Sequence, residues 1–344
     1  MMTKVFPFRM LGAALILASA SVITAQARAA TPNPSARLSN QALGQQQASL
    51  IFQILASELA IAQGEIGIAA ATYLSIARET KDPAAAKRAT ELAIAARSPS
   101  HAEQAAAIWL AANPNDPEAQ GTLDLLQLAV GEGEKLVRSL MVRRQRAIEA
   151  KELDGFVDYV AGLAGRSPNK PLGVSVFERV TAQDRDKPSV TYTLAMLYER
   201  VDRFDDMERL LRRLIAKEPS HAHARNALGY HFADRNQRLP EALALIEEAL
   251  RLAPNDAHII DSMGWVQYRL GNLEAAEKYL RQAYRQQPDA EISTHLGEVL
   301  WVAGKTAEAE SFLKAAFRAD PRNEVLLETL KRLGIPALRV HPQQ

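Results

Sequence analysis

Apolar residues recur every three or four positions along most of the chain, and glycines and prolines interrupt this pattern at regular intervals. Between Ile259 and Pro288, apolar positions share one face before Gly271 and again after it. This spacing predicts two amphipathic helices. Glycine readily takes the left-handed conformation that ends a helix, so Gly271 predicts a tight turn between the two helices. Proline cannot continue a helix, so Pro288 ends the second one.

The same helix–turn–helix pattern recurs toward the end of the chain. Pro219, Pro254, Pro288 and Pro321 are separated by 35, 34 and 33 residues. A period of about 34 residues indicates a solenoid of stacked helical pairs. We expect Gly264 and Ala276 to lie where the two helices of a pair cross, because they lack bulk there. The predicted structural repeat positions are Gly229, Ala242, Pro254, Gly264, Gly271, Ala276, Pro288, Gly297, Gly304, Ala309 and Pro321.

The pattern divides the chain into six parts. They are a signal peptide (1–29), a disordered linker (30–48), degenerate helical pairs (49–147), an irregular helical connector (148–187), a regular repeat array (188–321), and a capping helix with a tail (322–344). In the connector, the stretch from Gly165 to Pro171 is longer than a standard repeat turn, and the sequence leaves open whether it is a hinge. We therefore predict an all-α solenoid of seven or eight helical pairs with a C-terminal capping helix, which covers the last apolar edge.

The N-terminal residues have the features of a secretory signal. Lys4 and Arg9 precede an apolar run from Met10 to Ala25, and small residues follow at Ala27 and Ala29. This run is shorter than the about 20 residues that span a membrane. We expect export to the periplasm and cleavage; the alternative is an uncleaved N-terminal anchor. No cysteine follows the run, so no lipid anchor can be attached there.

Composition excludes several functions. The net charge is +1 with interspersed signs, which argues against a nucleic-acid partner because such a partner needs a basic stripe. The absence of cysteine excludes disulfides, cysteine-bound zinc and thiol catalysis. The sequence contains no His-Glu-x-x-His motif, phosphate-binding glycine loop or Gly-x-Ser-x-Gly motif. We therefore predict no catalytic residue, metal or cofactor, and we interpret His221 as a residue at a helix start, with Ser220 as the N-cap.

A stripe of polar and aromatic residues remains as the candidate binding surface. His258, Asp261, Trp265 and Tyr268 are spaced by three, four and three residues, so they share one face of a helix. The equivalent positions in the neighbouring repeats include Asn226, Tyr230, Glu291, Glu298 and Trp301. We predict that this stripe lines the concave side and binds a protein or peptide partner. The predicted groove residues are Asn226, Tyr230, Asp261, Trp265, Tyr268, Glu298 and Trp301.

The rings of this stripe allow two interpretations. Tyr230, Trp265, Tyr268 and Trp301 either form an aromatic row that faces solvent in a groove, or they pack between repeats. Aromatic side chains are favoured at interfaces, which supports the first interpretation. The second holds if the predicted helix phase is wrong by one residue.

The recurring glycine, alanine and proline positions resemble those of tetratricopeptide repeat (TPR) proteins, over about residues 188–333 and more weakly over 49–147. This resemblance implies a right-handed superhelix. Two strings, Leu-Gly-Tyr-His-Phe-Ala-Asp-Arg from Leu228 and the stretch from Asp261 to Trp301, are similar to exported bacterial TPR adaptors of carboxy-terminal processing proteases. That resemblance implies a protease and its substrates as partners. The chain departs from this type in lacking the lipid-anchoring cysteine. It also lacks the lysines of TPR proteins that clamp a C-terminal carboxylate.

We therefore expect a non-catalytic periplasmic scaffold or adaptor that binds a protein or peptide partner in its concave groove and presents substrates to an envelope protease. The alternative is a structural TPR subunit of an envelope assembly for polysaccharide export or outer-membrane biogenesis.

Overall fold

The structure is a computed structural model that describes residues 34–336. This part of the chain forms seventeen α-helices and one 3-10 helix, with no strand. The helices are α1 (Pro34–Ala62), α2 (Ile66–Thr80), α3 (Pro83–Ala95), α4 (Pro99–Ala112), α5 (Pro117–Ala129), α6 (Gly133–Ala150), α7 (Leu153–Gly165), α8 (Lys170–Val180), η1 (Ala182–Asp184), α9 (Pro188–Glu199), α10 (Phe204–Lys217), α11 (Ala222–Asp234), α12 (Leu239–Leu252), α13 (Ala257–Arg269), α14 (Leu273–Gln286), α15 (Ala290–Val302), α16 (Thr306–Ala319) and α17 (Glu324–Leu333).

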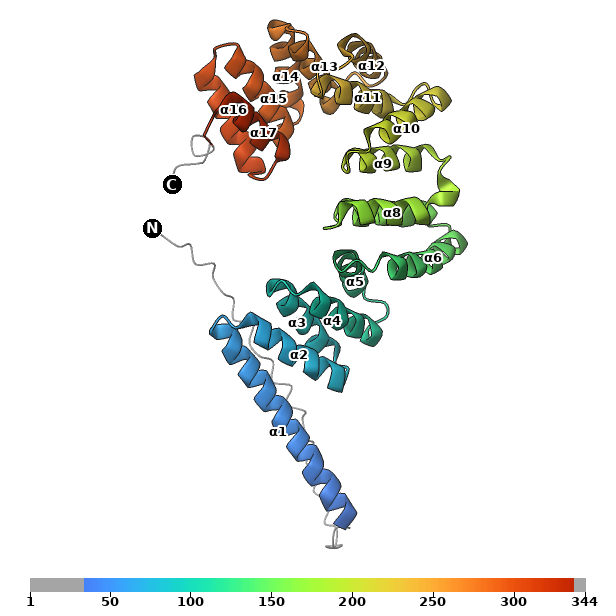
Figure 1. Ribbon diagram of the computed structural model, residues 1–344, viewed down its shortest axis with the longest axis vertical. Coiled ribbons are helices and arrows are strands. Elements are labelled where there is room, and N and C mark those ends of the chain that lie inside the picture. Colours follow the sequence, from blue (N-terminus) through green and yellow to red (C-terminus); the bar gives the residue numbers. More distant parts are fainter. Residues whose placement is uncertain (1–33, 337–344) are drawn as a thin grey trace, which may run out of the picture.

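The helices form eight consecutive pairs followed by α17, and the pairs follow one another around an open arc (Figure 1). Each helix packs on the next one along the chain, and in the C-terminal half some first helices of neighbouring pairs also touch: α11 contacts α13, and α13 contacts α15. This confirms the predicted all-α solenoid, including the number of pairs. No helix between residues 34 and 336 is both long enough and apolar enough to cross a membrane.

The predicted turn and crossing residues lie where the sequence places them. Gly271 ends α13 with a φ of 86°, a left-handed conformation that favours glycine. At Gly264, an added Cβ would lie only 2.6 Å from Cγ of Leu280 and 3.2 Å from the carbonyl oxygen of Ala276. In the flanking pairs, an added Cβ would lie 2.7 Å from Cγ1 of Ile246 at Gly229 and 2.8 Å from Cγ of Leu313 at Gly297. The missing side chain therefore allows the two helices of each pair to approach closely.

The predicted disordered linker is corrected for the residues that the structure describes. Helix α1 begins at Pro34 and runs without interruption through residue 48, whereas the sequence pattern predicts no helix before Ser49. Leu50, Ile54 and Ile61 pack on the N-terminal core. The C-terminal half of α1 packs on the core, and the helix continues from it toward the N-terminus. The alanine, leucine, arginine and glutamine residues between positions 35 and 47 favour this extension because they have high helix propensity. The predicted signal peptide, 1–29, lies outside the described residues.

The connector is also more regular than predicted. Helices α7 and α8 form an ordinary pair, and the turn between them runs only from Arg166 to Asn169. Pro171 lies inside the first turn of α8, where its missing N–H costs no hydrogen bond. Asn169 caps the helix, because its Oδ1 accepts a hydrogen bond from the N–H of Leu172 at 3.1 Å. The N-cap of α11 is likewise His221, whose Nδ1 accepts from the N–H of Ala224 at 3.1 Å, and not Ser220.

The core is a series of clusters along the arc, as expected when each repeat contacts only its neighbours. The last cluster confirms the predicted capping helix. Leu326 and Leu330 of α17 pack on Leu313 and Ala316 of α16. Helix α17 therefore covers an apolar edge that the final pair would otherwise expose.

Candidate functional site

The predicted groove residues lie on three adjacent first helices. Asn226 and Tyr230 belong to α11; Asp261, Trp265 and Tyr268 to α13; Glu298 and Trp301 to α15. The structure therefore brings the predicted stripe together on neighbouring helices. Three of these residues, Asn226, Tyr230 and Asp261, line a pocket, whereas the other four do not.

Trp265 belongs to the buried group, and the expectation that it faces solvent is wrong. Only 1% of its surface is exposed. Its indole stacks on the imidazole of His295 with 4.1 Å between ring centroids, and the Arg269 guanidinium lies 4.7 Å from the indole ring. Helix α15 covers this face of α13, so the indole packs between repeats.

His295 is the centre of a buried polar network between α11, α13 and α15. Its Nδ1–H donates to the Asp261 carboxylate at 2.9 Å, and its Nε2 lies 3.4 Å from the Tyr230 hydroxyl. That hydroxyl in turn donates to Oε1 of Glu291 at 3.0 Å. Burial alone would lower the pKa of His295, but the nearby charges of Asp261, Glu291 and Glu298 raise it to about 9. The imidazole is therefore positively charged at neutral pH.

Glu298 belongs to a second buried network, which ties α17 to α15. Its side chain has no exposed surface and pairs with the guanidinium of Arg332 at 2.5 Å. The hydroxyls of Tyr268 and Thr329 donate to the same carboxylate at 3.0 and 3.1 Å. All of these partners belong to the chain itself, and together they neutralise and hydrogen-bond the buried Glu298 carboxylate. Glu298 is therefore a structural residue of the C-terminal cap.

A pocket of about 200 Å³ lies beside the His295 network, across the first helices of four successive pairs. From the predicted stripe it contains Asn226, Tyr230 and Asp261, but not Trp265, Tyr268, Glu298 or Trp301. Its complete lining is Tyr192, Met196, Glu199, Asn226, Ala227, Tyr230, His258, Asp261, Ser262 and Glu291. The pocket therefore contains only part of the predicted aromatic row. It also extends one repeat further toward the N-terminus, because α9 contributes to its lining.

Helix α9 also contributes to this pocket, although its residues are absent from the predicted stripe. Tyr192 and Met196 precede Asn226 and Tyr230 by 34 residues, which is one repeat. Extending the stripe by one period would have found both. Glu291 and His258 were part of the stripe but not among the predicted groove residues. In the structure both line the pocket, and Glu291 accepts a hydrogen bond from the Tyr230 hydroxyl.

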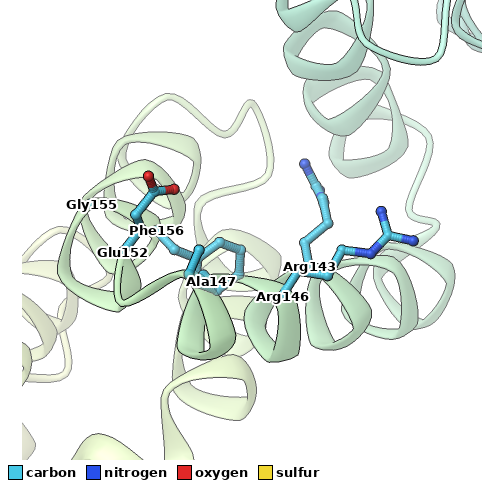
Figure 2. Close-up of a pocket in the computed structure, with 7 residues that line it drawn as sticks. Arg143, Arg146, Ala147, Glu152, Gly155 and Phe156 are labelled. Atoms are coloured by element: carbon cyan, nitrogen blue, oxygen red, sulfur yellow. The ribbon is translucent and has the colours of Figure 1, made fainter.

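A second pocket, of about 610 Å³, lies between α6 and α7. Figure 2 shows Arg143 and Arg146 extending on one side of it, and Glu152 and Phe156 on the other. Arg143 already pairs with Asp124 at 2.5 Å and lies over the ring of Tyr159. Because one of its two arginines is already engaged within the protein, this pocket is the weaker candidate.

The described residues contain no cluster of three or more histidine, aspartate or glutamate side chains that could hold a metal ion.

Comparison with known proteins agrees with the repeat pattern. Residues 192–257 and 262–324 match the tetratricopeptide repeat family. A TPR repeat-containing protein of Pseudomonas aeruginosa is 50% identical over 103 residues, which are 30% of this chain and 18% of that protein. The chain is thus similar to less than a fifth of that relative.

Among solved structures, similar folds include two bacterial TPR proteins. One, from Thermus thermophilus, is 23% identical with a TM-score of 0.43, over 49% of this chain and 91% of that one. The other, from Parabacteroides merdae, is 14% identical with a TM-score of 0.48, over 71% of this chain and 96% of that one. TPR repeat proteins are generally non-catalytic scaffolds that bind other proteins. Two stretches of this chain, residues 192–257 and 262–324, thus match the TPR family, and the all-α solenoid of the described residues is consistent with a TPR superhelix.

Proposed function

We propose that this protein is a non-catalytic adaptor that holds a segment of a protein partner in the groove formed by α9, α11, α13 and α15. The pocket shared by these four helices carries the proposal. Helix α11 contacts α13, α13 contacts α15, and α9 supplies part of the pocket lining, so an extended segment lying on these helices would cross several repeats.

The proposal extends to the cell envelope. The charged, apolar and small residues within 1–29 support export to the periplasm, and the strings around Leu228 and Asp261 support an adaptor that presents substrates to a carboxy-terminal processing protease. Sequencing the N-terminus of the protein purified from its own cells tests the first part. An N-terminus near residue 30 supports export with cleavage, whereas an intact Met1 contradicts it.

Site-specific photo-cross-linking tests the groove. In the test protein a photoreactive amino acid replaces Asn226, which lines the pocket. In the matched control it replaces Lys278, an exposed residue of α14. We expect irradiation of living cells to link position 226, but not position 278, to a small set of envelope proteins that includes a protease or its substrates. Equal products from both positions, or none from position 226, would contradict binding in the groove. Products consisting only of subunits of one export complex would contradict the protease adaptor.

A further inference from the structure

We propose that the groove pocket accepts a positively charged side chain, an arginine or a lysine, from an extended segment of the partner. This inference rests on the proposed function of the same site and adds the chemistry of the occupant.

The charge of the pocket is the first argument. Three carboxylates, Glu199, Asp261 and Glu291, are among its lining residues, and the lining contains no lysine or arginine. His295 balances the charge of Asp261. Among the described residues, Glu291 has no lysine or arginine within ion-pair distance, and its hydrogen bond from Tyr230 is neutral. The pocket therefore has a net negative charge that a cation would balance.

A surplus of hydrogen-bond acceptors is the second argument, and it is independent of charge. Asn226 lines the pocket, and its buried Oδ1 has no hydrogen-bond partner within the protein, so a turn of the amide toward the pocket would offer this acceptor to a ligand. The single hydroxyl proton of Tyr230 is already directed to Glu291, and burial raises the pKa of Tyr230 so that the hydroxyl keeps this proton. An unsatisfied buried acceptor is costly, so a ligand rich in donors is favoured. A guanidinium has five N–H donors and an ammonium has three, and neither is an acceptor.

The rings and the size of the pocket agree with this occupant. Tyr192 and Tyr230 both line it, and aromatic faces attract cations. Its volume of about 200 Å³ suits one long side chain. Because four first helices supply the lining, an extended backbone along the groove can insert one residue while its neighbours lie across adjacent repeats.

Two peptides that differ only in charge test the inference. The probe is a fluorophore-labelled Ser-Ala-Ala-Arg-Ala-Ala-Ser peptide, and the control contains citrulline, a neutral residue of nearly the same shape, in place of arginine. Fluorescence anisotropy at low ionic strength measures both affinities. We expect the citrulline peptide to bind at least about tenfold more weakly. Equal affinities, or no binding of the arginine peptide at millimolar protein, would overturn the proposal.

Variants of the protein identify the site. Glu291→Gln keeps an acceptor for Tyr230 but removes the charge, and Glu274→Gln removes an exposed charge on α14. We expect Glu291→Gln to weaken the arginine peptide about tenfold and to leave the citrulline peptide unchanged, whereas Glu274→Gln changes neither. Melting curves confirm that both variants are folded. An equal response of the two variants would overturn the assignment to this pocket.

The two proposals fail in different ways. Suppose that the protein with the photoreactive residue at position 226 captures a partner. If it captures the partner equally well when it also carries Glu291→Gln, the groove binds a partner but not through a cation. If position 226 captures nothing, the groove function itself is wrong.

Discussion

Trp265 and His295 stack at the junction of α13 and α15, where 1% of the tryptophan surface and none of the histidine surface is exposed. The imidazole is charged, so the contact combines packing with cation–π attraction. At the residue scale this stacked pair holds two repeats in register, and the Asp261 carboxylate fixes the orientation of the imidazole.

Truncating the indole should therefore reduce stability directly. Trp265→Ala removes a buried aromatic side chain and should lower the free energy of unfolding by about 3–5 kcal/mol. Val302→Ala is a suitable control, since 46% of Val302 is exposed. Urea unfolding followed by circular dichroism measures both. A loss for Trp265→Ala no larger than that for Val302→Ala would show that the indole is not part of the core.

The charge of His295 makes stability depend on pH. Its pKa is about 9 in the folded protein and about 6.5 when free, so folding stabilises the protonated form. This contribution, at most about 3 kcal/mol, is fully present below pH 6.5 and is lost as the pH rises through about 9. The melting temperature of the wild-type protein should thus fall more steeply between pH 7 and pH 9.5 than that of His295→Gln. As a control, His223→Gln replaces an exposed histidine and should show the same change of melting temperature with pH as the wild-type protein. If the melting temperatures of all three proteins change in parallel with pH, the charge of His295 does not contribute to stability.

At the scale of the helical element, small residues decide how closely the two helices of a pair pack. Gly264 meets Leu280 and the carbonyl of Ala276 at distances that leave no room for a Cβ, whereas Gly121 in α5 has no such neighbour within 4 Å. Both glycines lie inside first helices, Gly264 as the eighth residue of α13 and Gly121 as the fifth residue of α5, but they meet different surroundings.

The same substitution should therefore have opposite effects at these two positions. Gly264→Ala should destabilise the protein by about 1–3 kcal/mol through overpacking. Gly121→Ala should stabilise it by up to about 1 kcal/mol, because alanine favours helix more than glycine. Thermal unfolding of the two variants separates these effects. A stabilising Gly264→Ala would mean that Leu280 moves aside without cost.

At the scale of the whole molecule, the array needs a covered end. Leu326 and Leu330 of α17 shield the apolar edge of α16, and Arg332 neutralises the Glu298 carboxylate. The rest of the arc is stabilised by contacts between neighbours, so damage at this end should spread inward from the last pair.

Removal of residues 323–344 should promote aggregation and lower the melting temperature. Light scattering and size-exclusion chromatography measure the first effect, and calorimetry the second. Arg332→Leu is an informative companion, because it keeps apolar contact but leaves the buried Glu298 without its cation. A truncated chain that stays monomeric and equally stable would show that α17 is not the cap.

The sequence by itself determined the helical pairs, their turns and the residues at their crossings. These features depend on local chemistry. A period of three to four residues makes one face apolar, a glycine such as Gly271 permits a left-handed turn, and a small residue such as Gly264 permits close approach. The same local signals located the capping helix from Asn323 onward, since its N-cap and apolar face lie within a few residues of one another.

Only the tertiary structure decided which side chains of the stripe are buried. Trp265 and Asp261 share a helix face with Tyr268, but their burial depends on how α15 is rotated and placed over α13. That placement also brings His295 to Asp261, a residue 34 positions away, and Arg332 to Glu298, also 34 positions away. The groove pocket needs four helices at once. Periodicity gives the face of one helix, whereas the superhelical twist, which results from packing between repeats, decides which faces meet and which stay open to a partner.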